Sequence, residues 1–149
     1  MKIDTILVPT DFSDDANKAL ETATDLAKLA GAKILVVHAY HVEIPLATPL
    51  GGDSYRLPEG FYEQLRSEAT EQVDAVAADL RSKGIEASGI ACQESASSAI
   101  VEQAARNSAD LIVMGTRGLT GVKHVLLGSV AERVVRLAPC AVLTVKHSS

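Results

Sequence analysis

The segment DLIVMGTRGLTGVKHVLLGS, residues 110–129, joins a short apolar run to a stretch with glycines at positions 115, 118, 121 and 128. The run DLIVMG predicts a buried strand, and the residues that follow Ser129 have the spacing of a helix. In parallel α/β sheets, ligands bind at the carboxyl ends of the strands, where such loops lie. The segment therefore predicts an α/β fold with a ligand site after this strand.

The same alternation of an apolar run with a segment of helical spacing occurs in the rest of the chain. Apolar runs predict further strands at residues 3–9, 33–39, 85–92 and 141–145. Helical spacing predicts helices at about residues 16–30, 59–83, 96–107 and 129–137, and residues 40–58, with three prolines and a Gly51-Gly52 pair, predict a loop. With right-handed crossovers, these elements form an open, twisted, mainly parallel five-stranded sheet with helices on both faces.

Length and composition agree with this fold. A chain of 149 residues suits a single domain over residues 1–149 with one sizeable core. Apolar residues make up 47% of the sequence but aromatic residues only 3%, so we expect an aliphatic core of the kind that parallel strands form under helices.

The net charge and the hydropathy pattern of the chain exclude some classes of binding partner. A formal net charge of −5 argues against nucleic acid or an anionic membrane surface as a partner. No apolar run approaches the ~18 residues that a membrane span needs. Cys92 and Cys140 lack a CxxC or metal-binding spacing, which indicates small buried residues in a reducing compartment. We therefore expect a cytoplasmic protein.

The glycine-rich stretch has the chemistry of a phosphate site. Glycines permit positive φ angles and let backbone amides approach an anion, while Arg117 and Lys123 add positive charge. The N-terminus of the helix after Ser129 adds unpaired N–H groups. Alternatively, Ser129 and Glu132 form only a capping box, and the glycines serve only turns. Neither the Walker A motif nor GxGxxG occurs.

The pattern Gly115-x2-Gly118-x9-Gly128-Ser129 resembles the nucleotide motif of the universal stress protein family. The opening ILVPTDFS, residues 6–13, is similar to the first strand and turn of that family, and residues 110–118 are also typical of it. The resemblance extends over about residues 2–146. It implies an adenine nucleotide alpha hydrolase-like fold with strand order 3-2-1-4-5 and ATP, or another adenine nucleotide, bound with Mg²⁺ between the first and fourth strands.

The resemblance also implies roles for individual residues. Asp11 would form a hydrogen bond with the ribose, and Thr10 would belong to the same turn. Pro9 and Ala39 would lie near the adenine. Met114 would line the nucleotide pocket. Around the phosphates it implies the residues Gly115, Arg117, Gly118, Gly128, Ser129 and Val130. For Asp11, an alternative from the sequence alone is a helix N-cap.

Three functions are compatible with these observations. The resemblance favours an ATP-binding stress-response protein that acts as a nucleotide-dependent sensor or regulator. The alternatives are a slow ATPase or nucleotide-dependent transferase, and a scaffold that needs no nucleotide; the sequence contains no evident pair of catalytic groups. The short apolar strand at Ala141–Val145 would lie at a sheet edge, so we expect it to be covered in a homodimer.

Overall fold

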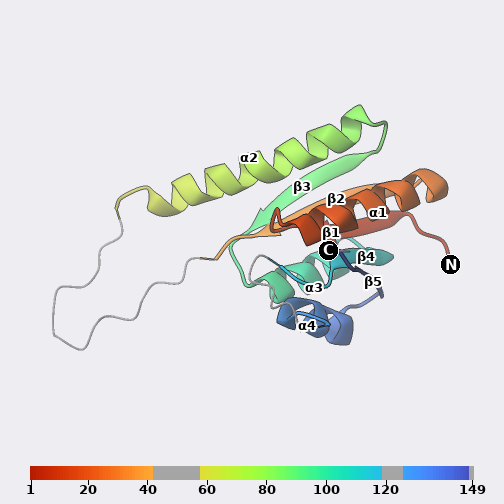
Figure 1. Cartoon of the computed structure of the whole chain (residues 1–149). Helices are drawn as coiled ribbons and strands as arrows, with labels where there is room; N and C mark the ends of the chain where they lie inside the picture. Colours follow the sequence, from red (N-terminus) through yellow and green to blue (C-terminus); the bar gives the residue numbers. More distant parts are fainter. Residues whose placement is uncertain (42–57, 119–125, 148–149) are drawn as a thin grey trace.

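The computed structural model describes residues 1–41, 58–118 and 126–147, and it contains a five-stranded parallel sheet in the order β3-β2-β1-β4-β5 (Figure 1). The strands are β1 (Thr5–Pro9), β2 (Lys33–Ala39), β3 (Ala87–Cys92), β4 (Leu111–Gly115) and β5 (Ala141–Val145). Both the strand order and the α/β class agree with the predictions from sequence. The order places β1 and β4, which are distant in sequence, side by side at the centre of the sheet.

Four helices cover the two faces of the sheet. Helices α1 (Asp14–Ala30) and α2 (Phe61–Ser82) lie on one face, and α3 (Ala96–Arg106) and α4 (Ser129–Leu137) lie on the other (Figure 1). Strand side chains alternate between the two cores, so that Ile6 and Val8 pack under α1 and α2 while Leu7 packs with α3 and α4. Both cores are aliphatic, as the composition predicts.

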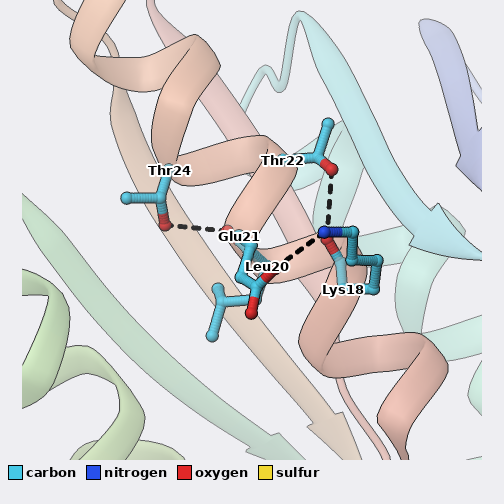
Figure 2. Close-up of polar contacts among 5 residues, drawn as sticks. All are labelled: Lys18, Leu20, Glu21, Thr22 and Thr24. Atoms are coloured by element: carbon cyan, nitrogen blue, oxygen red, sulfur yellow. Dashed lines mark hydrogen bonds and ion pairs between the residues drawn. The ribbon is translucent and has the colours of Figure 1, made fainter. Parts of the chain in front are cut away.

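Helix α1 has a defined start and end. Ser13 is its N-cap and accepts a hydrogen bond from the Ala16 N–H, and Gly31 ends it in the left-handed conformation. On the helix itself, Lys18 pairs with Glu21, and the hydroxyls of Thr22 and Thr24 donate to backbone carbonyls one turn earlier (Figure 2). The cap at Ser13 sets the start of α1 close to the carboxyl end of β1.

Strand β3 contains Gly89 because helix α2 crosses it closely. A Cβ built at this position would lie 2.9 Å from the carbonyl oxygen of Val73. Gly89 pairs in register with Val36, so the strand is continuous through the glycine. Because Gly89 has no side chain, α2 can pack directly against the sheet.

The element boundaries differ from the predicted ones by at most two residues. Strands β1 and β3 each begin two residues later than predicted, and α2 begins at Phe61 instead of residue 59, because Gly60 adopts a left-handed conformation and is the N-cap. Most of the predicted loop, at 42–57, lies outside the described residues. Over the described ranges, no helix is both long and apolar enough to cross a membrane.

Candidate nucleotide-binding site

A cavity of about 580 Å³ opens at the carboxyl ends of the central strands. All eleven residues predicted from the sequence line it: Pro9, Thr10, Asp11, Ala39, Met114, Gly115, Arg117, Gly118, Gly128, Ser129 and Val130. The structure thus brings together the ends of β1, β2 and β4 with the start of α4. A volume in this range is typical of small-molecule sites.

Six further lining residues were not predicted from the sequence: Ala16, Val37, Ala96, Ile100, Thr116 and Ala131. Three of them, Val37, Ala96 and Ile100, give the cavity an apolar side between β2 and α3. In the sequence they follow the same periodic patterns as core residues, so no sequence signal separates them from the core. Only the packing of α3 across the end of β2 shows that they face a cavity.

The turn after β1 is held by hydrogen bonds from short polar side chains. The Phe12 N–H donates to Thr10 Oγ1 over 3.0 Å, and the Ser13 N–H donates to Asp11 Oδ1 over 3.0 Å. The N-cap of α1 is Ser13, so the alternative interpretation of Asp11 as the helix cap is wrong. Asp11 precedes the cap, and its carboxylate lies at the cavity.

The glycine-rich segment approaches this turn closely. A Cβ at Gly118 would lie 2.6 Å from Oδ2 of Asp11, and one at Gly115 would lie 2.9 Å from Cβ of Asp15. Among the described glycines, those with positive φ are Gly31, Gly60 and Gly84, so Gly115, Gly118 and Gly128 do not use the positive φ angles that glycine permits. Close approach between chain segments accounts for these glycines instead.

The start of α4 presents backbone amides to the cavity. The helix begins at Ser129 with Gly128 as its N-cap, so the interpretation of Ser129 as a capping-box residue is wrong. Because glycine has no side chain, the N-cap supplies no acceptor to the first turn of α4, and that turn remains suited to an anion. The Gly128 N–H is already used, since it donates to the Thr116 carbonyl over 2.6 Å.

The buried carboxylate of Asp15 forms an ion pair with Arg117, which lines the cavity. Asp15, in the first turn of α1, is buried, and its Oδ2 lies 3.5 Å from Nε of Arg117. This pairing depends on the approach of α1 to the end of β4, which joins residues far apart in the sequence. Because Asp15 lies next to Nε, the two terminal nitrogens of the Arg117 guanidinium remain available as hydrogen-bond donors.

Residues 119–125 of the predicted phosphate segment, which include Gly121 and Lys123, lie outside the described residues. Among the residues that are described, no three His, Cys, Asp or Glu side chains gather as a metal site would require. Cys92 is buried and Cys140 is half-buried, and burial raises the pKa of both thiols. Low thiolate content fits the predicted packing role for these cysteines.

Comparison with known proteins places the chain among relatives along its whole length. The sequence profile of the universal stress protein family matches residues 2–146. A universal stress protein of Thermus aquaticus is 41% identical over 145 residues, which cover 95% of this chain and 98% of the relative.

Solved structures agree with the observed fold. The structure of MJ0577 from Methanocaldococcus jannaschii superposes with a TM-score of 0.81 at 25% identity, covering 100% of this chain and 99% of that one. A universal stress protein in complex with cAMP has a TM-score of 0.66 at 27% identity and covers 99% and 100% of the two chains. A protein from Archaeoglobus fulgidus in complex with dAMP has a TM-score of 0.65 at 26% identity, covering 97% and 98%. On its sequence and its fold alike, the chain belongs to the universal stress protein family.

Proposed function

We propose that this chain binds an adenine nucleotide, ATP with Mg²⁺, in the cavity at the carboxyl ends of β1 and β4, and acts as a nucleotide-dependent sensor or regulator in the cytoplasm. The observation that carries the proposal is the division of the cavity into two chemically different parts. Val37, Ala39 and Ile100 offer an apolar side of the kind that suits a purine ring. Arg117 and the first turn of α4 suit phosphates.

The relatives that hold cAMP and dAMP support an adenine base and at least one phosphate as the common ligand. Asp11 follows β1, which lies between β2 and β4, so an adenine on the apolar side at β2 and phosphates after β4 would leave the ribose near Asp11. A carboxylate accepts hydrogen bonds from both ribose hydroxyls, which gives Asp11 a binding role.

Magnesium would enter this site together with the phosphates. Mg²⁺ retains several waters and is usually held by substrate phosphates with one or two protein oxygens. At the phosphate end of the cavity, the hydroxyl of Ser129 is an oxygen of this kind. The cavity therefore fits an ion that is carried by the nucleotide better than a permanent metal centre.

Thermal melting with ATP and Mg²⁺ tests the proposal, because a ligand that binds only the folded state stabilises it by mass action. We expect the melting temperature to rise with the concentration of ATP. Ser129→Ala should reduce this rise, whereas Ser82→Ala, a matched change of another exposed serine at the end of α2, should leave it unchanged. Mass spectrometry of the purified protein under native conditions would show which nucleotide is retained.

An unchanged melting temperature at millimolar ATP, ADP and AMP would contradict the proposal. The alternative of slow ATP hydrolysis is decided by product analysis after long incubation. Turnover that Asp11→Ala abolishes would favour an enzyme, and intact ATP bound to the protein would favour a sensor.

A further inference from the structure

The end of β2 contacts the turn that carries Asp11. Nδ1 of His38 lies 2.9 Å from the carbonyl oxygen of Thr10. A carbonyl oxygen can only accept a hydrogen bond, so this contact requires the proton of the imidazole on Nδ1. The same ring packs against Phe12, with ring centroids 4.6 Å apart and planes tilted by 55°.

The turn that His38 contacts has an unusual backbone. Phe12 has a φ of 63°, in the left-handed region that bulky residues rarely occupy. Such a conformation persists only where surrounding contacts hold it, and it concentrates at functional sites. Here the Thr10 hydroxyl holds the Phe12 N–H and the imidazole covers the Phe12 ring.

The Thr10 carbonyl is well placed to set the position of Asp11. The peptide plane that contains this oxygen also contains the N–H and Cα of Asp11, so fixing the carbonyl fixes the direction of the next residue. On its other side, the Thr10 N–H donates to the Val37 carbonyl over 2.8 Å. Both peptide groups of Thr10 are thereby tied to the end of β2, while the Asp11 carboxylate meets Gly118.

We propose that His38 is a positioning residue of the nucleotide pocket: its Nδ1–H holds the Thr10 carbonyl, and its ring holds Phe12, so that Asp11 keeps its place against Gly118. His38 itself does not line the cavity and acts through Thr10 and Phe12. This role rests on the proposed nucleotide-binding function.

Nitrogen NMR of the ligand-free protein tests the geometry directly. We expect the neutral imidazole of His38 to carry its proton on Nδ1 and to have an unprotonated Nε2, because the hydrogen bond selects the tautomer. A His38 ring protonated on Nε2 and bare at Nδ1 would overturn the proposal, whether or not a nucleotide binds.

Two substitutions at His38 test the Nδ1–H donor and the aromatic ring separately. His38→Phe keeps an aromatic ring against Phe12 but leaves the Thr10 carbonyl without its donor, and we expect ATP affinity to fall about fivefold to tenfold. His38→Asn places an amide donor close to the position of Nδ1 and should recover most of the affinity. His41→Phe, at an exposed histidine three residues later, is the matched control and should leave affinity within about twofold of the wild type.

The possible outcomes are distinct. Weakened binding in His38→Phe, with amide shifts at Asp11 and Gly118 in the absence of ligand, supports the positioning role. Unchanged affinity in His38→Phe, even with a lower melting temperature, would overturn that role and leave the proposed function intact. Failure of the wild-type protein to bind any adenine nucleotide would overturn both. If His38→Phe does not fold, His38→Asn and the tautomer of the wild-type ring still decide the question.

Discussion

At the scale of single residues, Gly118 is a position where the missing side chain leaves room for the carboxylate of Asp11. A Cβ there would lie 2.6 Å from Oδ2 of Asp11, which is closer than real Cβ contacts allow. Gly118→Ala must therefore displace the Asp11 carboxylate, and we expect nucleotide affinity to fall about tenfold. Calorimetric titration with ATP measures the change.

A companion variant identifies the cause of that loss. In Asp11→Ala the carboxylate is already absent, so adding Gly118→Ala should weaken binding little further. Losses of affinity that simply add in the double variant would show that the alanine methyl acts on something other than Asp11.

The pair of Asp15 and Arg117 makes a second prediction at this scale. The Asp15 side chain is 10% exposed and that of Arg117 is 26% exposed, so removing the cation leaves a buried carboxylate without its partner. Arg117→Gln should lower the free energy of unfolding of the nucleotide-free protein by about 1 kcal/mol, because partial exposure screens the pair. Urea unfolding gives this value.

The double variant Asp15→Asn/Arg117→Gln completes the thermodynamic cycle. It removes both charges and should recover most of the stability lost in Arg117→Gln. Strictly additive effects of the two substitutions would mean that the ion pair contributes nothing to folding.

At the scale of secondary-structure elements, Asp110 joins the starts of β1 and β4. Its Oδ2 accepts hydrogen bonds from the N–H groups of Thr5 and Asp4, and these bonds lower the pKa of the carboxyl below its ordinary value of 3.8. A lowered pKa in the folded state stabilises the fold above the pKa of the unfolded state, and this contribution disappears as the pH falls through the folded value.

The corresponding test compares the wild type with Asp110→Asn over pH. The variant should be less stable at neutral pH, and the difference in the free energy of unfolding should shrink as the pH falls below 3.8. Urea unfolding at a series of pH values measures it. If the difference in the free energy of unfolding stays the same in acid, the loss in Asp110→Asn comes from packing and not from the charge of the carboxylate.

The contact between α2 and β3 gives another prediction for elements. Gly89→Ala would place a methyl group 2.9 Å from the Val73 carbonyl oxygen, in the backbone of α2, so the helix must shift. We expect the free energy of unfolding to fall by about 1–3 kcal/mol. Ser88→Ala, the exposed neighbour on β3, should change it by less than about 0.5 kcal/mol.

At the scale of the whole molecule, β5 forms one edge of the sheet and pairs with β4 alone among the described strands. Exposed apolar side chains lie on it and on α4: Leu143, Val135 and Leu137 are 38%, 50% and 51% exposed. These features support the proposed homodimer through β5, because an apolar edge strand favours pairing with a second copy.

Sedimentation of two charged variants tests the dimer. Leu143→Lys should convert a dimer to a monomer, since it places a charge in the proposed interface. Leu29→Lys, at a residue that is 86% exposed on α1, replaces an isolated apolar side chain and should leave the assembly unchanged. A monomeric wild type at micromolar concentration would contradict the proposal.

Local sequence patterns determined the elements and most of the candidate site. Strand and helix periods, together with turn residues such as Gly31, placed every element of the fold within two residues, because each pattern reflects neighbours along the chain. Four residues of the motif, Gly115, Gly118, Gly128 and Ser129, line one cavity, and the proposal puts the phosphates there.

Only the tertiary structure decided the contacts between elements. Pairing of Asp15 with Arg117, the role of Gly118 beside Asp11 and the contact of His38 with Thr10 each join segments separated by at least 28 residues. The side chains of α3 that line the cavity follow the same pattern as side chains of the core. Periodicity records whether a residue faces inward, but whether it meets another side chain or an open cavity depends on how the helices pack on the sheet.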